Sequence, residues 1–365
     1  MDKVRLWVHL GMPKTGTSAL QSFLNHNSDV LLNNGVLYPD MGVMQHFPLV
    51  RSLAKEVGSP AVFPKGGQER SVYEFSNTIK EDVSRSGASA VVLSSEFFFD
   101  YPGLTPKRGD YPIEQALPHI KNVAQRLKEA FSEFDPAIVV WLRRQDDWLM
   151  SMYNNVVKAH SYEKSFERFR REQVAPWYGS ILSQWGDIFG DEAITVLVYQ
   201  KGGADYDTVT RFIELIGFAA IDDLVKPPSN VREGNIGLPR ELMYMKREFN
   251  RALVLPAPRA RSEIEDYFFN LAHNKRYWER DFPILSPAKR QQLLNDFAYE
   301  NELVVTRFMA GMAGELFDAE LPSQEEWEPF VGYDSITMNE VYVGLLAPLI
   351  KRINYLEKML SKVPQ

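Results

Sequence analysis

The chain of 365 residues contains no cysteine. Disulfide bonds, thiolate nucleophiles and cysteine-ligated metal sites are therefore excluded. Long apolar runs are also missing, because the longest uninterrupted one, residues 137–142, is far shorter than the roughly 20 residues that cross a bilayer. The N-terminus enters "VRLWVHLG" without the apolar region and cleavage site of a signal peptide. We expect a cytoplasmic protein without a transmembrane segment.

The sequence also lacks an excess of positive charge. Its net charge is -7 and its pI is near 5.6. Binding along a nucleic-acid backbone needs a broad surplus of Lys and Arg, so a general nucleic-acid binder is not expected. Hydrophobic residues make up 45% and charged residues 24%, which is typical of a folded protein.

Four short, continuous apolar runs predict buried parallel strands, at residues 4–10, 90–93, 137–142 and 193–198. Segments with helical spacing alternate with them, for example Leu20, Phe23 and Leu24, with Thr17 or Ser18 near the expected N-cap. This alternation predicts an α/β fold of the P-loop type, with three α/β/α layers around a mainly parallel sheet. Ligands of such sheets bind outside the carboxyl ends of the strands.

The character of the sequence changes after about residue 225. The stretch "KPPSNVREGNIGLP" predicts a long loop, and residues 240–252, 285–309 and 338–363 predict helices. Ser286 before Pro287 is suited to an N-cap followed by proline at the first helical position. We therefore expect a core over residues 1–225 and a mainly helical extension over residues 226–365. The last segment fits a docked amphipathic helix or, alternatively, a homodimer contact.

The eight residues "GMPKTGTS" join the first predicted strand to the first predicted helix. Their two glycines permit a backbone whose amides converge on an anion, and the helix adds its positive N-terminal end. Three hydroxyl side chains supply further donors. The alternative is a simple glycine turn with a solvated lysine.

The lysine of this loop is not where a nucleoside triphosphate loop has it. That loop would carry lysine at the position of Thr17, followed by a metal-binding hydroxyl at Ser18. Here the lysine is Lys14, inside the loop, and the nearest candidate for a metal-binding acid at a strand end is "VVLSSE". The pattern indicates transfer from a nucleotide with one 5′-phosphate and a leaving group, without an obligatory metal.

The stretch "HLGMPKTGTSALQSFL" resembles the 5′-phosphosulfate loop of sulfotransferases that use 3′-phosphoadenylyl sulfate (PAPS). It is most similar to bacterial sulfotransferase-family proteins. The resemblance covers about residues 4–217 and implies that the loop binds PAPS and releases the bisphosphate PAP. It assigns this binding to Pro13, Lys14, Thr15, Gly16, Thr17 and Ser18. Lys14 would neutralise charge on the departing phosphate.

A second anion site is expected in "WLRRQDDWLMSMY". In sulfotransferases, an arginine at a strand end and a serine at this spacing hold the 3′-phosphate, which implies Arg143 and Ser151. Adjacent strand residues point to opposite faces, so Arg144 is expected to pair with Asp146 or Asp147 instead. The alternative is a strand that ends in exposed arginines before an acidic helix start.

Two residues are candidates for the base that accepts the acceptor's proton. Glu96 follows the second run, and its apolar neighbours Phe97, Phe98 and Phe99 would raise its pKa and line an acceptor pocket. His46 in "GVMQHFPLV" is the other candidate. Each has a structural alternative, as a helix N-terminal charge and as a structural histidine. His9 is expected to be buried structure.

The acceptor of the implied transfer is expected to be a carbohydrate or glycolipid hydroxyl, or an amine. A late loop with Asn230, Arg232 and Asn235 is a further candidate to cover the nucleotide, although it lacks the family's usual Arg-Lys-Gly form. Two other functions stay open at this point. One is a P-loop kinase or NTPase with an atypical loop, and the other is a non-catalytic protein that binds PAP.

Overall fold

The computed structural model describes most of the chain from residue 3 to residue 361. The residues it leaves out between these limits are 60, 62, 100–112, 201–207, 219–223, 226–236, 253–257, 274–281, 311–313, 318–320, 322–325 and 333–334. Asn230, Arg232 and Asn235 therefore lie outside the described residues.

The chain forms two compact units, each assembled from separate segments. The first comprises Met1–Met152, Ser165–Asn235 and Arg290–Leu321, and the second comprises Tyr153–Lys164, Ile236–Lys289 and Pro322–Gln365. A domain boundary between residues 225 and 226 stays a prediction, because residues 219–223 and 226–236 are not described.

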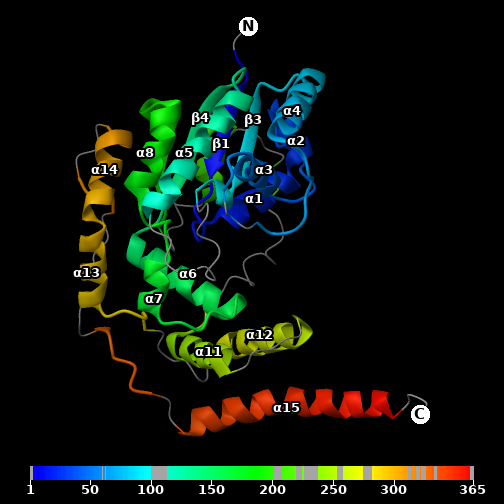
Figure 1. Ribbon diagram of the computed structural model, residues 1–365, viewed down its shortest axis with the longest axis vertical. Helices are drawn as coiled ribbons and strands as arrows, with labels where there is room; N and C mark the ends of the chain where they lie inside the picture. The colour runs from blue at the N-terminus through cyan, green and yellow to red at the C-terminus, as the bar shows by residue number, and fades with distance from the viewer. Residues whose placement is uncertain are drawn as a thin grey trace. The chain divides into compact units, whose positions relative to one another are not determined.

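The first unit is built on a five-stranded parallel sheet, which confirms the predicted α/β fold (Figure 1). Its order is β2-β3-β1-β4-β5. The strands are β1 (Arg5–Leu10), β2 (Val36–Leu37), β3 (Ala90–Ser95), β4 (Asp135–Leu142) and β5 (Ile194–Val198). The four predicted strands are present with ends shifted by one or two residues. Only β2 was not predicted, because two apolar residues make no recognisable run.

Helices cover both faces of the sheet. On one face, Val92, Val139 and Trp141 pack in an apolar cluster with α1 (Thr17–His26), α2 (Ser28–Asn33) and α9 (Thr208–Leu215). Strand residues alternate between faces, and Val91 and Ile138 on the other face are fully buried too. The helices of that second layer contact one another and are α3 (Phe47–Glu56), α4 (Val72–Ser86), α5 (Ile113–Ala130) and α8 (Tyr178–Phe189).

The register of the strands brings three chain segments to one edge of the sheet. Leu10 at the end of β1 lies opposite Ser95 of β3 and Val140 of β4. Because all strands are parallel, the loop after β1, the residues after β3 and the residues after β4 leave the sheet at its carboxyl edge. The edge where a ligand is expected therefore holds "GMPKTGTS", Glu96 and Arg143.

The remaining elements of the first unit extend this framework. Short 3-10 turns, η1 (Glu96–Phe98) and η2 (Asp191–Ala193), follow β3 and precede β5. The other helices are α6 (Gln145–Ala159), α7 (Phe166–Arg171), α13 (Pro287–Asp296) and α14 (Ala298–Phe308), of which α6 and α13 continue beyond this unit. The predicted helix over residues 285–309 is thus two helices. At its start, the Lys289 amide donates to the Ser286 hydroxyl over 3.3 Å, as expected of an N-cap.

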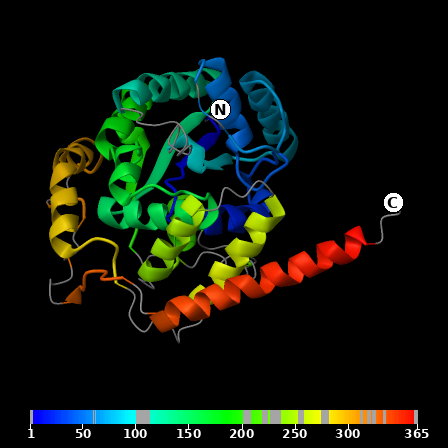
Figure 2. The same cartoon turned by 60° about the horizontal axis from the view of Figure 1, so that its bottom comes forward.

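The second unit is helical in its described part, with α11 (Arg240–Ala252), α12 (Pro258–His273) and α15 (Ser335–Leu360) (Figure 2). The helix predicted over residues 240–252 has those same limits. α11 packs on α12 through the rings of Phe249 and Phe268, whose centroids are 5.7 Å apart. No helix in the described part of the chain is long and apolar enough to cross a membrane.

Candidate functional site

The loop after β1 has two residues in the left-handed backbone region, Lys14 (φ 68°) and Gly16 (φ 84°). Left-handed residues alternating with right-handed ones form a concave run of amides that binds anions. Lys14 is the more telling of the two, because a residue with a Cβ adopts this conformation only at a cost of about 1–2 kcal/mol. The loop backbone is therefore shaped for an anion.

Four of the loop's carbonyls are held by side chains. Thr15 Oγ1 donates to the carbonyl of Met12 over 2.6 Å, and Trp148 Nε1 donates to that of Pro13 over 2.8 Å. Arg143 Nη1 donates to the carbonyl of Lys14 over 3.1 Å, and Thr208 Oγ1 donates to that of Thr15 over 3.0 Å. Carbonyls engaged in this way turn away from the inside of the loop, so the amides are left to face an anion.

Glycine is required at both ends of the loop. A Cβ on Gly11 would lie 3.0 Å from the backbone nitrogen of Glu96, so a side chain there would push β1 and β3 apart. A Cβ on Gly16 would lie 2.7 Å from Thr208 Oγ1, in addition to the left-handed strain. Close packing around the loop thus depends on both glycines.

Gly16, rather than Thr17 or Ser18 as expected, is the N-cap of α1, and no side chain caps the helix. Leaving this N-terminus without a side-chain cap leaves its first amides open to a ligand. Thr17 is buried, and its hydroxyl donates to Glu96 Oε1. Thr17 is consequently available to an anion through its backbone amide, whereas Ser18 is only partly buried.

Glu96 begins the η1 turn directly after β3, at the loop's side. Burial raises the pKa of the Glu96 carboxyl above its ordinary value, and the hydrogen bond from Thr17 and the positive charge of Lys14 partly oppose that rise. Lys14 is therefore close enough to act electrostatically on Glu96. A carboxylate with a raised pKa, next to a cation, has the properties of a general base.

The three phenylalanines after Glu96 belong to the core. Phe97 contacts the ring of Phe47, Phe98 that of Trp185 and Phe99 that of Tyr178. All three are buried. That they raise the pKa of Glu96 stays a prediction. Their expected place in the lining of an acceptor pocket also stays a prediction, because the neighbouring residues 100–112 are not described.

His46 lies beside β3, and both of its ring nitrogens form hydrogen bonds with backbone atoms. Nδ1 accepts from the Ser94 amide over 3.0 Å, so Nε2 carries the proton and donates to the Pro39 carbonyl over 2.9 Å. Burial lowers the pKa of His46 to about 4, against weaker opposing effects of the Pro39 bond and of Asp40. Taking up a second proton would break the bond to Ser94. His46 therefore joins α3 to β3, and His9 is fully buried as expected.

Arg143 comes from the end of β4 and reaches the loop. Besides donating to Lys14, its guanidinium lies over the ring of Tyr199, 5.6 Å from the centroid. Ser151 lies in α6 three residues beyond Trp148, which contacts the loop, so the two residues share a face of that helix. The arginine and the serine therefore come from elements that both touch the loop.

Arg144 points into a buried ion-pair cluster, as predicted. Its Nε donates to Asp146 Oδ1 over 2.8 Å, and its Nη2 lies 3.6 Å from Asp147. Arg290 completes the cluster with a 2.6 Å bond to Asp146 and a 2.8 Å bond to Asp147. The side chains of the neighbouring residues Arg143 and Arg144 thus point in opposite directions at the end of β4, one toward the loop and the other toward Asp146.

Sequence reasoning missed three residues that shape the site. Trp148 stands within the motif quoted for the 3′-phosphate, but nothing marked its bond to the loop. Thr208 is the first residue of α9 and Tyr199 follows β5, and neither belongs to a recognisable pattern. Only the position of Tyr199 at a strand's carboxyl end was a usable signal.

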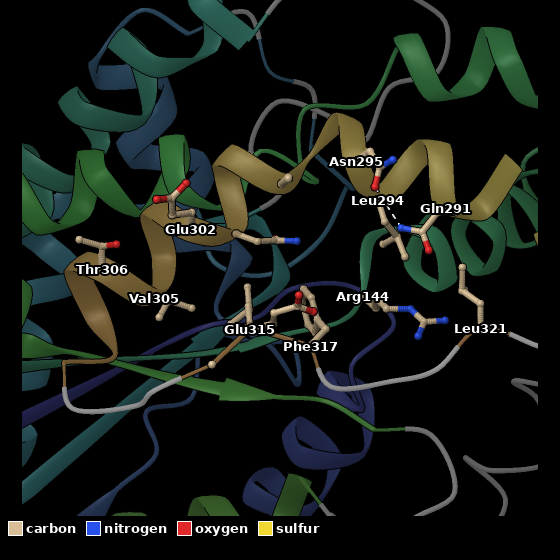
Figure 3. Close-up of a pocket in the computed structure, with 14 residues that line it drawn as sticks. Arg144, Gln291, Leu294, Asn295, Glu302, Val305, Thr306, Glu315, Phe317 and Leu321 are labelled. Carbon is tan, nitrogen blue, oxygen red and sulfur yellow. Dashed lines mark hydrogen bonds between the residues drawn. The ribbon is translucent and has the colours of Figure 1, made fainter. Parts of the chain in front are cut away.

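A cavity of about 470 Å³ lies elsewhere in the first unit, beside α13 and α14 (Figure 3). Arg144, Gln291 and Phe317 are among its lining residues. None of the loop residues lines it, and neither Glu96 nor Arg143 does. This cavity is therefore separate from the candidate site.

Comparison with known proteins gives distant matches. No family model matches the chain. An uncharacterized protein of Archaeoglobus fulgidus is 28% identical over 166 residues, which are 45% of this chain and only 44% of that relative. The crystal structure of a sulfotransferase from Alicyclobacillus acidocaldarius is 18% identical, with a TM-score of 0.35, and the match covers 70% of this chain and 98% of that one. These similarities are too distant to assign a ligand or an activity.

Proposed function

We propose that the chain transfers a sulfuryl group from PAPS to a hydroxyl or amine acceptor and releases PAP. The observation that carries this proposal is the meeting of Lys14, Thr17 and Glu96 around an anion-shaped loop. The resemblance of "HLGMPKTGTSALQSFL" to a 5′-phosphosulfate loop gives the anion its chemical identity.

The loop amides and the N-terminus of α1 would hold the 5′-phosphosulfate. Thr15 and Gly16 contribute backbone amides, and Ser18 contributes a hydroxyl. Pro13 has no N–H to donate, so it contributes by fixing the backbone that leads into Lys14. Lys14 neutralises the charge that grows on the phosphate oxygen as the bond between that oxygen and sulfur breaks. The acceptor oxygen or nitrogen forms the new bond to sulfur.

Arg143 and Ser151 are proposed to bind the 3′-phosphate. A guanidinium gives two parallel, charge-assisted hydrogen bonds to a phosphate, and a helix hydroxyl adds a neutral donor. The proposal draws on the position of Arg143 at the strand end, with its head already held at the loop. This second contact would distinguish PAPS from nucleotides without a 3′-phosphate.

Glu96 is proposed as the base in preference to His46. It is partly accessible and next to Lys14, and its raised pKa makes it a better proton acceptor than an ordinary carboxylate. His46 is fully buried and uses its unprotonated nitrogen to accept from Ser94. In this scheme the acceptor's proton ends on the Glu96 carboxylate.

The proposed acceptor is a carbohydrate or glycolipid hydroxyl. Glycan-directed sulfotransferases often use a glutamate base, and Glu96 fits that role. This part of the proposal depends on the resemblance alone.

A magnesium-dependent phosphotransferase is the second candidate, and one observation favours it. Glu96 follows β3, the strand beside β1, and lies next to the loop, where P-loop NTPases carry the acid that helps to hold Mg²⁺. Thr17 in place of the usual lysine speaks against this candidate. A non-catalytic PAP-binding protein is the third.

Calorimetric titration with PAP, and with ATP in the presence and absence of Mg²⁺, separates these functions. Sulfotransfer predicts metal-independent, micromolar or tighter binding of PAP and feeble binding of ATP. Preference for Mg-ATP would overturn the proposal in favour of a phosphotransferase. Lys14→Ala should then abolish transfer of labelled sulfate from PAPS, whereas Lys55→Ala, at an exposed position of α3, should not change it. Tight PAP binding without transfer to any acceptor would leave the non-catalytic function.

A further inference from the structure

The last helix, α15, packs on its own unit through one narrow face. Tyr267 of α12 donates its hydroxyl to the carbonyl of Val341 over 3.0 Å, and Val341 is buried. A Cβ on Gly344 would lie 2.0 Å from the Tyr267 hydroxyl oxygen, so glycine permits this close approach. Val341 and Gly344 therefore mark the face that α15 turns toward α12.

The opposite face of α15 is apolar and exposed. At 100° per residue, a stripe of large apolar side chains is centred roughly 160° around the helix from Val341 and Gly344. Its members are between 44% and 66% exposed and are Tyr342, Val343, Leu346, Ile350, Ile353 and Leu356. Scattered exposed apolar residues need no explanation, but a continuous stripe of this length marks an interaction surface.

The spacing of apolar residues in this segment is that of a coiled coil. Positions 342, 346, 349, 353, 356 and 360 are all apolar, with alternating intervals of four and three residues. This is the a and d pattern of a heptad repeat, in which 346, 353 and 360 are a positions. Asn339 falls on the preceding a position, where a polar residue selects register and a defined oligomer.

The charges beside this seam are complementary between two parallel copies. Arg352 occupies a g position, and Glu357 is five residues later at the next e position. In a parallel two-stranded coiled coil, each g residue faces the e residue five positions later on the other helix. Both Arg352 side chains would then meet a Glu357 of the other copy, while an antiparallel pair would not match them.

The end of α15 also lacks support from the part of the chain that the structure describes. All residues from 351 to 359 are exposed except the partly buried Arg352, and Figure 2 shows α15 as one continuous helix. A helical segment shorter than about 12–15 residues is marginal in water on its own, so packing must stabilise the exposed end over residues 351–359. A membrane surface is a poor occupant, because α15 has three basic residues and two acidic ones rather than a strongly basic polar face.

We propose that α15 pairs with α15 of a second copy of this chain as a parallel two-stranded coiled coil. The described residues of the seam are Asn339, Tyr342, Leu346, Ile353 and Leu356, which are all exposed, and reciprocal pairs of Arg352 and Glu357 flank them. This pairing is independent of the proposed sulfotransfer.

Sedimentation velocity of the full-length chain tests the pairing. The expected mass is twice 41.9 kDa at micromolar concentration. Ile353→Glu puts a charge into the seam and should return the mass to that of one chain. Asn354→Glu is the control, because Asn354 is exposed on the same helix and lies off the seam at a b position. A wild-type monomer would overturn the proposal, as would a dimer equally insensitive or equally sensitive to both changes.

Charge exchange and cross-linking test the orientation. Arg352→Glu and Glu357→Arg should each weaken the dimer, and the double variant should restore it. Because the chain has no cysteine, Asn339→Cys provides a single thiol, which should give a disulfide-linked dimer under mild oxidation only in a parallel, in-register pair. Failure of the double variant to restore the dimer, together with no cross-link, would refute the parallel coiled coil. Circular dichroism of each variant checks that it is folded.

Discussion

Replacing Arg143 by alanine separates its two roles, because the side chain has a structural contact and a proposed ligand contact. The structural contact is the hydrogen bond to the Lys14 carbonyl, supported by the ring of Tyr199. The proposed contact is a bidentate bond to the 3′-phosphate of PAP. Adenosine 5′-monophosphate, which has no 3′-phosphate, reports on the first role alone.

The two roles predict losses of different size. Losing one partly exposed hydrogen bond at the loop costs about 0.5–1.5 kcal/mol. The affinity for adenosine 5′-monophosphate should therefore fall by roughly 2- to 10-fold. Two hydrogen bonds to a charged group contribute about 3–6 kcal/mol. The affinity for PAP should therefore fall by a further factor of roughly 10² to 10⁴. Arg143→Lys keeps the charge but not the bidentate geometry, and should fall between these limits.

Titration calorimetry with both nucleotides measures these losses directly. Arg85→Ala is a suitable control, because Arg85 is highly exposed at the end of α4 and should leave both affinities unchanged. Equal fold losses for PAP and for the monophosphate in Arg143→Ala would refute the reasoning. Arg143 would then act on the loop alone, and the 3′-phosphate would need another partner.

Further variants test the loop and the base. Gly16→Ala should lower the free energy of unfolding by about 2–5 kcal/mol, from left-handed strain and overpacking, and by less in a Thr208→Ala background, which removes the nearest atom. Urea denaturation measures this, and an equal cost in both backgrounds would contradict the clash. Because the pKa of Glu96 is raised, kcat/KM should fall on acidification at a pH above the usual range of a glutamate. This acid limb of the pH profile should move to still higher pH in Thr17→Val, which removes the opposing hydrogen bond, and should vanish in Glu96→Gln. A raised pKa also makes the contribution of Glu96 to stability fall as pH rises, so Glu96→Gln should be more stable than wild type at neutral pH. His46→Asn should keep the acid limb of the kcat/KM profile. If that limb disappears in His46→Asn, His46 is the base.

The sheet was predictable because its strands are buried on both faces. Continuous apolar runs marked β1, β3, β4 and β5, and only the two-residue β2 escaped. Helix limits were harder to predict. Proline usually ends or kinks a helix, yet Pro118 lies inside α5 (Ile113–Ala130).

The geometry of the candidate site was predictable where one short motif determines the backbone. "GMPKTGTS" identified the loop, and strand alternation separated Arg143 from Arg144 correctly. The contacts of Trp148 and Thr208 were not predictable, because a hydrogen bond from a distant side chain to a loop carbonyl leaves no periodicity in the sequence. The environment of His46 was hidden for the same reason, since its partners are backbone atoms of Pro39 and Ser94.

The side chains that hold the loop carbonyls also determine when the site can form during folding. Three of those bonds join residues 129, 135 and 193 positions apart in the sequence. Contacts of such separation are made late, because the entropy of closing long loops is lost before they form. A nascent chain that has not yet reached Thr208 therefore cannot complete the loop. Nucleotide binding during refolding should appear with the last kinetic phase, and it should stabilise only the fully assembled unit.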